Sequence, residues 1–447
     1  MAEVAQRIVA PSFVRTRLRA FDRTSRGAIA QSVERFAAAG VALVISVVAA
    51  RRLTPLDFGY FSLVTSSVAL LVPICTLGLV GTLVNQMVRD ESRSLGWMAR
   101  AMAVRIAVGT LIGLALLAAL LGGWLARESA VLIIVPPLLG LTTSFHAFEA
   151  RSDLVRLAWI RVVGSVVALV VLVVAWFRPS PGLFALAFIT MYVVPGVVAH
   201  RWVMRGQSSY ERVQWSEMRP LVQRSLPLII STVGLVLNLR IDQIMIAWLD
   251  DVTAVGPYAI ATNFSESLTF VAAAIAASHA AGLTRAHVLD GADVAGDARH
   301  YDREVGLMYR KLRRSGVATT VFSVVVGCAA IPLLYGPRYL AAIPILLVHS
   351  VGSFWYGLRQ GVSRQLIVED LIWLSVYSQL LAAAVNIVLN LFMIPWLSGL
   401  GAAISTLVSY FATGALMIFT RSGRHIGWRF LGFSGRRALT PSHQETA

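Results

Sequence analysis

Long apolar runs separated by short polar or turn-forming segments dominate the pattern of this chain. A membrane-spanning helix needs about 20 mostly apolar residues, because the hydrocarbon core is about 30 Å thick and a helix rises about 1.5 Å per residue. Runs of that length occur at residues 30–50, 58–83, 101–123, 130–150, 157–177, 182–203, 225–249, 254–280, 315–335, 339–358, 371–395 and 399–420. The pattern therefore predicts an all-α polytopic membrane protein with about twelve transmembrane helices.

Proline and glycine mark several of the predicted breaks between these helices. They cluster at residues 178–182 (RPSPG), 335–337 (YGP) and 395–399 (PWLSG). Both residue types interrupt regular helix and favour turns. The longest internal connection, residues 281–314, is polar, and we expect it to be a solvated linker.

Composition strengthens the membrane assignment. Hydrophobic residues make up 57% of the 447 residues and charged residues 14%, and the mean hydropathy is +0.71. A soluble domain carries about 25% charged residues, so an aqueous globular protein is excluded. The two cysteines, Cys75 and Cys328, lie inside apolar runs and provide neither a disulfide framework nor a thiolate metal site. We expect no metal and no cofactor.

The positive charges predict how the chain is oriented. Placing the N-terminus in the cytoplasm puts 32 of the 39 Lys and Arg residues on the cytoplasmic side and five outside, with Arg35 and Arg240 inside helices. Residues near a helix end, Arg105 included, are counted with the adjoining connection. Such an excess predicts that both termini are cytoplasmic. A nucleic-acid partner is excluded, because the arginines are spread over every inner connection despite the net charge of +16.

A weak internal repeat suggests how the helices are grouped. Aligning Gly59 with Gly256 superposes residues 58–63 on residues 255–260, each at the start of the second helix of a six-helix half. Halves with an even number of helices form parallel repeats with a central cavity between them. The expected organisation is a cytoplasmic Arg-rich tail, an N-terminal bundle, a cytoplasmic linker, a C-terminal bundle and a cytoplasmic tail, at residues 1–27, 28–203, 204–224, 225–420 and 421–447.

Short motifs in four regions of the chain resemble those of a known family. They are ARRLTPLDFGYFSL (50–63), LPLIIS followed by RIDQIMI (226–231 and 240–246), VGPYA (255–259) and IPWLSGLGAA (394–403). Together they resemble the Wzx-type polysaccharide and O-antigen repeat-unit flippases of the multidrug/oligosaccharidyl-lipid/polysaccharide (MOP) exporter superfamily. The resemblance covers nearly all of residues 28–420.

This resemblance implies a transporter of the bacterial inner membrane and not an enzyme. Its implied substrate is an undecaprenyl-diphosphate-linked oligosaccharide, which moves from the inner to the outer leaflet of the bilayer for O-antigen or exopolysaccharide synthesis. The polysaccharide polymerase and the export machinery are further candidate partners. The resemblance does not specify the sugar.

Two ionisable residues of the predicted seventh helix are candidates for function, because a charge at membrane depth costs about 2.5–3.5 kcal/mol. Arg240 and Asp242 stand about 15 and 12 Å below the outer end of this helix. They are about 200° apart around the helix and face different ways. A diphosphate requires a cation that stays charged and offers a fork of donors. Arg240 is therefore the first candidate to bind the diphosphate.

Carboxylates at the same depth are candidates for ion coupling. Glu266 lies on the next helix, one turn after Asn263. Asp242 and Glu266 could bind a coupling H⁺ or Na⁺, because a carboxylate in a low-dielectric environment favours a bound cation. Alternatively, Arg240 pairs with Glu266, or Asp242 with Asn263, and the pair only holds two helices together. A tight pair with Arg240 would weaken the ion-coupling interpretation.

Further polar residues within the helices could contact the substrate. Arg35 in the first helix is a second candidate for the diphosphate, although its side chain could instead extend to the membrane interface. Asn386 and Asn390, one turn apart, could bind sugar hydroxyls or form interhelical hydrogen bonds. Three histidines could carry protons, but packing roles are more common for such residues; they are His146, His279 and His349.

The sequence favours transport by alternating access and leaves two alternatives. One is a cation-coupled multidrug exporter of the same superfamily, whose cavity would be acidic, whereas the deep charges here are balanced. The other is a membrane polymerase or ligase of lipid-linked sugars, which needs acid and base groups on an aqueous face. The outer connections are only a few residues long, which disfavours the enzyme.

Overall fold

The computed structural model describes residues 11–76, 80–205, 214–292 and 299–433. Every regular element within these ranges is a helix. The chain divides into two compact units, Met1–Leu226 and Pro227–Ala447.

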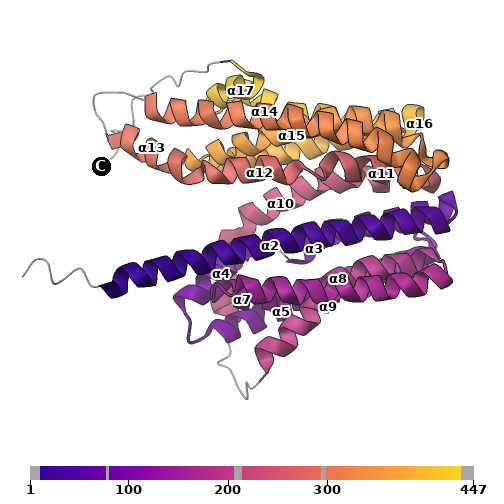
Figure 1. Ribbon diagram of the computed structural model, residues 1–447, viewed down its shortest axis with the longest axis horizontal. Helices are drawn as coiled ribbons and strands as arrows, with labels where there is room; N and C mark the ends of the chain where they lie inside the picture. Colours follow the sequence, from indigo (N-terminus) through magenta and orange to yellow (C-terminus); the bar gives the residue numbers. More distant parts are fainter. Residues whose placement is uncertain (1–10, 77–79, 206–213, 293–298, 434–447) are drawn as a thin grey trace, which may run out of the picture. The chain divides into compact units, whose positions relative to one another are not determined.

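Long helices make up most of the described part of unit 1, and a series of short helical segments covers residues 127–150. Its helices α2, α8 and α9 lie side by side (Figure 1). Asp153 and Ser180 accept hydrogen bonds from the first turns of α8 and α9, and Pro181 begins α9, an arrangement typical of helix starts. The elements are α2 (Pro11–Arg52), α3 (Pro55–Thr76), α4 (Val80–Arg89), α5 (Ser94–Leu121), η1 (Arg127–Ile133), α6 (Val135–Leu139), η2 (Gly140–Ser144), α7 (Phe145–Ala150), α8 (Leu154–Phe177) and α9 (Pro181–Met204).

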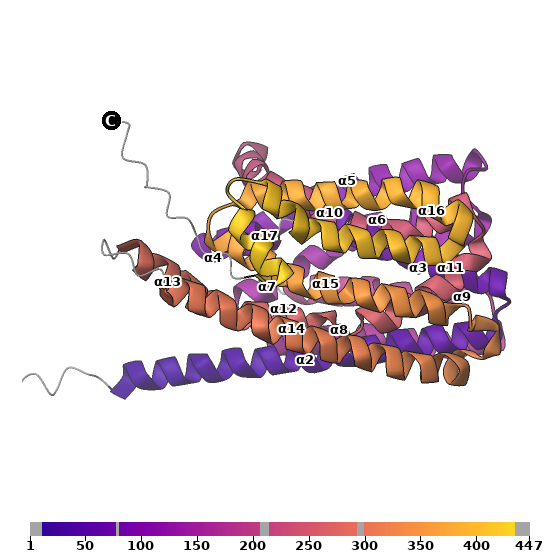
Figure 2. The same cartoon turned by 90° about the horizontal axis from the view of Figure 1, so that it is seen from above.

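Unit 2 begins within the long helix α10 and has three further long helices, α14, α15 and α16, that pack together (Figure 2). Asp251 caps the start of α11 by accepting a hydrogen bond from the backbone N–H of Thr253. The elements are α10 (Trp215–Leu249), α11 (Val252–Glu266), α12 (Thr269–Ser278), α13 (Ala280–Ala292), α14 (Arg299–Ala330), η3 (Ile331–Tyr335), η4 (Pro337–Tyr339), α15 (Ala342–Val368), α16 (Ile372–Ala415), η5 (Leu416–Phe419) and α17 (Arg424–Leu431).

Ten helical segments of the described chain are long and apolar enough to cross a membrane. The sequence pattern predicts about twelve such segments. Helix α15 is not among the ten, and residues Ile372–Phe419 count as a single segment. That segment is broken at Ser398, whose φ of 52° and ψ of −136° are not helical. The chain reverses so tightly there that a Cβ on Gly401 would lie 2.2 Å from the carbonyl oxygen of Met393.

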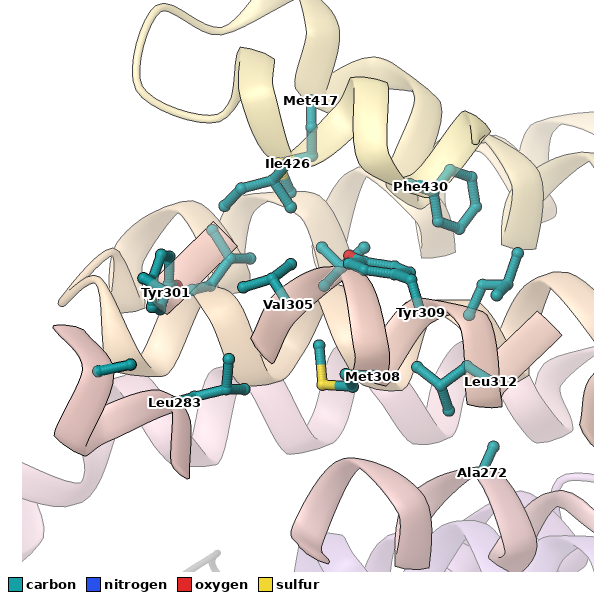
Figure 3. Close-up of a cluster of buried hydrophobic side chains, with 14 residues drawn as sticks. Ala272, Leu283, Tyr301, Val305, Met308, Tyr309, Leu312, Met417, Ile426 and Phe430 are labelled. Atoms are coloured by element: carbon teal, nitrogen blue, oxygen red, sulfur yellow. The ribbon is translucent and has the colours of Figure 1, made fainter. Parts of the chain in front are cut away.

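The connection expected to be a solvated linker, residues 281–314, is mostly helical and partly buried. Helix α13 and the first half of α14 occupy its described residues, whereas residues 293–298 lie outside them. Apolar side chains recur every three or four positions on α14, so one face is buried against α15 and α17 (Figure 3). The buried set includes Leu283, Tyr301, Val305, Met308, Leu312, Ile426 and Phe430. The expectation of a solvated linker was therefore wrong for this part of the chain.

Candidate functional site

Arg240 and Glu266 form an ion pair between α10 and α11. The guanidinium nitrogen Nη2 lies 3.0 Å from Oε2 of Glu266, and the two side chains are 25% and 16% exposed. This is one of the two pairings that the sequence left open as a link between helices. The pair is only partly buried, so it remains accessible to a ligand.

The Arg240–Glu266 pair lines a cavity of about 340 Å³ within unit 2. The rim includes the exposed side chains of Asn263 and Ser267, and the wall includes the buried Tyr410. The lining combines aromatic rings, hydroxyls, an amide and one pair of opposite charges, a mixture typical of sites for polar organic ligands. The lining residues are Leu239, Arg240, Asn263, Glu266, Ser267, Thr269, Ser353, Tyr356 and Tyr410.

Asp242 has a very different environment, because its side chain is sealed inside unit 2. It is 1% exposed. One carboxylate oxygen accepts hydrogen bonds from the hydroxyls of Tyr258 and Thr406, each at 2.5 Å, and the other accepts one at 2.7 Å from Nδ2 of Asn390. The alternative pairing with Asn263 is not formed.

Asn386 and Asn390 belong to the Asp242 cluster and do not line the cavity beside Arg240. Both are fully buried. Asn390 donates to Oδ1 of Asn386 at 3.1 Å, and Asn386 donates to the hydroxyl of Thr406 at 3.3 Å. Two features of α16 bring these groups together. The asparagines are one turn apart, and the reversal at Ser398 returns Thr406 to face them.

A buried histidine adjoins the same cluster. Nδ1 of His349 lies 2.7 Å from the hydroxyl of Ser265. Its ring centre is 6.0 Å from that of Tyr258 and 6.4 Å from that of Tyr410. His349 thus lies between an aromatic residue that bonds Asp242 and an aromatic residue that lines the cavity.

Unit 1 contains a buried cation that the charge count misplaced. Arg105, which was counted with a cytoplasmic connection, is fully buried within α5. One guanidinium nitrogen lies 3.1 Å from the hydroxyl of Thr143 and 3.2 Å from Nε2 of His146. Nδ1 of His146 in turn lies 2.8 Å from Glu149. Arg105 lies within the predicted helix 101–123 and was counted with the connection only because it stands near the start of that helix.

Arg35, the second candidate for the diphosphate, lies on α2 in unit 1 with an exposed side chain. Its neighbour Glu34 is buried and forms an ion pair of 3.7 Å with Arg161 on α8. The exposed position of Arg35 is compatible with a ligand contact and also with extension to the membrane interface.

Two carboxylates outside the apolar spans show how hydrogen bonds stabilise a charge at the helix ends. Arg93 donates to both oxygens of Glu217, at 2.7 and 2.9 Å. These hydrogen bonds lower the pKa of Glu217 to about 2. The pKa of Asp251 is also lowered, chiefly by the hydrogen bond from the hydroxyl of Thr253.

Comparison with known proteins gives a family match over part of the chain and structural matches over most of it. Residues 25–279 match the family described as "Polysaccharide biosynthesis protein". No curated protein gives a significant match. Among solved structures, the lipid II flippase MurJ in an inward closed conformation matches with a TM-score of 0.66 at 12% identity, over 90% of each chain.

Two MATE transporters are also similar in fold. A multidrug resistance MATE family transporter of the MOP superfamily, in an inward-facing conformation, gives a TM-score of 0.63 at 12% identity, over 88% of this chain and 95% of the other. A Vibrio cholerae MATE transporter gives 0.57 at 14% identity, over 92% and 96%. At these identities the likeness establishes the fold alone.

Proposed function

This chain belongs to the polysaccharide biosynthesis protein family and is a multi-pass membrane transporter with a MOP-superfamily fold, and we propose that it flips undecaprenyl-diphosphate-linked oligosaccharide repeat units. The lipid-linked substrate would enter from the cytoplasmic leaflet and leave in the outer leaflet of the bacterial inner membrane. Twelve spans, two six-helix bundles and cytoplasmic termini are part of this proposal. The lipid II flippase MurJ offers a precedent for a lipid-linked substrate on this fold.

The position of Arg240 is the observation that carries the proposal. Its guanidinium lines a 340 Å³ cavity within an apolar helical unit. Arginine stays protonated in such surroundings and donates in a planar fork that matches phosphate oxygens. A diphosphate would therefore find a permanent cation in this cavity.

Glu266 gives Arg240 a partner while no substrate is bound. A lone guanidinium at membrane depth is costly, and the 3.0 Å pair with Glu266 reduces that cost. A diphosphate carries more negative charge than one carboxylate and competes for the same donors. We propose that substrate binding loosens the pair, which makes Glu266 a resting partner of Arg240 and not a site of ion coupling.

We propose Asp242 as the site of the coupling cation. A carboxylate that is 1% exposed gains stability from a bound H⁺ or Na⁺. The hydroxyl oxygens of Tyr258 and Thr406 lie 2.5 Å from one of its carboxylate oxygens, and hydroxyl and carboxylate oxygens suit a hard cation. Asn390 turns its Nδ2 toward Asp242, and its Oδ1 atom is buried without a hydrogen-bond partner among the described residues, so rotation of the amide would present an oxygen to a cation bound there.

A cation-coupled multidrug exporter is the second candidate function. The MATE relatives share the fold, and Glu266 could attract an organic cation. We favour the anionic lipid because Arg240 neutralises that carboxylate in the cavity. A polymerase or ligase is disfavoured, since the structural relatives are transporters.

A transport assay distinguishes the two candidates. The full-length protein would be reconstituted into proteoliposomes with a fluorescent polyprenyl-diphosphate-linked oligosaccharide in one leaflet, and in parallel with ethidium. The proposal expects transbilayer movement of the lipid-linked saccharide, lost in Arg240→Ala, and no ethidium transport. Ethidium transport without saccharide movement would support the exporter and contradict the flippase.

A further inference from the structure

We propose that the cavity beside Arg240 contains a binding subsite for one pyranose ring, formed by Tyr356, Tyr410, Ser353 and Glu266. This inference rests on the proposed function, because it assigns the sugar attached directly to the diphosphate to this part of the cavity. It goes further than that function by naming the residues that would bind this sugar and distinguish it from others. Sequence reasoning gave that role to Asn386 and Asn390, which lie instead beside Asp242.

Unsatisfied polar atoms are the first argument for a ligand. Oε1 of Glu266, Oγ of Ser353 and the hydroxyl of Tyr410 are buried, yet they have no hydrogen-bond partner in the described part of the chain. All three residues line the same cavity. Buried polar groups normally have partners, because leaving such a hydrogen bond unmade is energetically costly. A ligand that carries several hydroxyls would satisfy all three atoms at once.

Aromatic rings on the same wall are the second argument. The ring centres of Tyr356 and Tyr410 are 5.2 Å apart, with the rings inclined at 51°. The guanidinium of Arg359 lies 4.9 Å from the centre of the Tyr356 ring and donates a hydrogen bond to Gln379. These contacts fix the orientation of Tyr356. A pyranose has apolar C–H faces as well as hydroxyls, so it suits a wall of fixed aromatic rings and unpaired polar atoms.

The charge and size of the cavity favour the first sugar over other ligands. Arg240 neutralises Glu266, so the wall offers little net attraction to an organic cation. A volume of about 340 Å³ is near the lower end of the range of about 300–1,000 Å³ for small-molecule sites. One or two sugar rings fit that space, whereas a whole repeat unit does not. The subsite would therefore discriminate at the sugar next to the diphosphate and not at distal sugars.

Binding of short-chain probes to the full-length protein in lipid nanodiscs tests this inference. The probes are farnesyl diphosphate and its diphosphate-linked conjugates with glucose, galactose and N-acetylglucosamine. The measured quantity is the ratio of the Kd of sugar-free farnesyl diphosphate to the Kd of each conjugate. We expect at least one ratio well above 1 in the wild type. Tyr410→Phe, which removes only a hydroxyl, should reduce that ratio about fivefold and leave the Kd of farnesyl diphosphate unchanged.

Two further variants complete the experiment. Ser353→Ala should act like Tyr410→Phe, whereas Tyr377→Phe, the matched change of an exposed tyrosine on α16 outside the cavity, should leave every ratio at its wild-type value. Equal binding of all four probes to the wild type, or no change of the ratio in Tyr410→Phe, would overturn the sugar subsite and leave the diphosphate role intact. Failure of farnesyl diphosphate itself to bind would overturn the proposed function.

Discussion

Arg240 and Asp242 are separated by a single residue of α10, yet their surroundings are opposite. Arg240 lines an open cavity and shares a partly exposed ion pair with Glu266. Asp242 is 1% exposed and accepts three hydrogen bonds from neighbouring helices. The rotation of about 200° between the two positions separates these environments.

This difference suggests that the two residues of α10 have different functions. An accessible cation with a replaceable partner suits a large anionic ligand, whereas a sealed carboxylate beside two hydroxyl groups suits a small cation. Both side chains belong to α10, so a shift of this helix on binding one ligand would also displace the other side chain. Substrate and coupling ion would then communicate through the helix itself.

The largest expected effect comes from removing the charge in the sealed cluster. Asp242→Asn keeps the shape of the side chain but loses the charge that binds a cation. We expect gradient-driven transport to fall at least about tenfold, to the rate without a gradient. Measuring transport in proteoliposomes with and without H⁺ and Na⁺ gradients checks this expectation.

Two control variants make the comparison specific. Asp251→Asn changes a capping aspartate outside the cavity and should retain full gradient dependence. Glu266→Gln should retain it as well, because we assign Glu266 to Arg240. Gradient dependence that survives in Asp242→Asn but is lost in Glu266→Gln would reverse the assignment of the two carboxylates.

A smaller effect is expected when the planar guanidinium group of Arg240 is replaced by the single ammonium group of lysine. Arg240→Lys keeps the positive charge but loses bidentate geometry. Binding of farnesyl diphosphate should weaken by about tenfold, corresponding to about 1.4 kcal/mol, and binding of farnesyl monophosphate should weaken less. Arg127→Lys, at an exposed position of unit 1, is the control. Equal losses for the two ligands would argue against bidentate contact with the diphosphate.

The smallest expected effect concerns the ion pair of Arg93 and Glu217, which lies outside the apolar spans. The pKa of Glu217 is about 2, below its ordinary value, so ionisation of Glu217 stabilises the fold above about pH 4.5 and this contribution disappears as the pH falls toward 2. Glu217→Gln should lower the melting temperature slightly at pH 6, and the difference should shrink at pH 3. A difference that grows on acidification would contradict the assigned pKa.

Sequence reasoning located the charged residues of the site but not most of their partners. Arg240, Asp242 and Glu266 stand out because charges within apolar runs are rare and costly. Tyr258, Thr406 and the cavity tyrosines do not stand out, because hydroxyl groups are common in membrane helices. Their roles arise from contacts between residues far apart in sequence, such as the bond between Thr406 and Asp242.

Turns and helix ends were likewise only partly predictable from the sequence. The breaks at residues 178–182 and 335–337 were predicted correctly, because proline and glycine mark them. The burial of Arg105 was missed, because the groups that contact it, on Thr143 and His146, lie 38 and 41 residues away in the sequence. The burial of one face of α13 and of the first half of α14 was also missed, because the helices that cover this face, α15 and α17, come later in the chain.

The double variant Arg240→Ala/Glu266→Gln tests the central claim most directly. Arg240→Ala alone leaves Glu266 without its 3.0 Å partner, so we expect a lower melting temperature and no export of lipid-linked oligosaccharide. Adding Glu266→Gln removes the unpaired charge and should restore the melting temperature and membrane abundance. Export should remain absent, because the cation that meets the diphosphate is still missing. Restored export in the double variant would show that Arg240 only holds two helices together and would contradict its role as the substrate ligand.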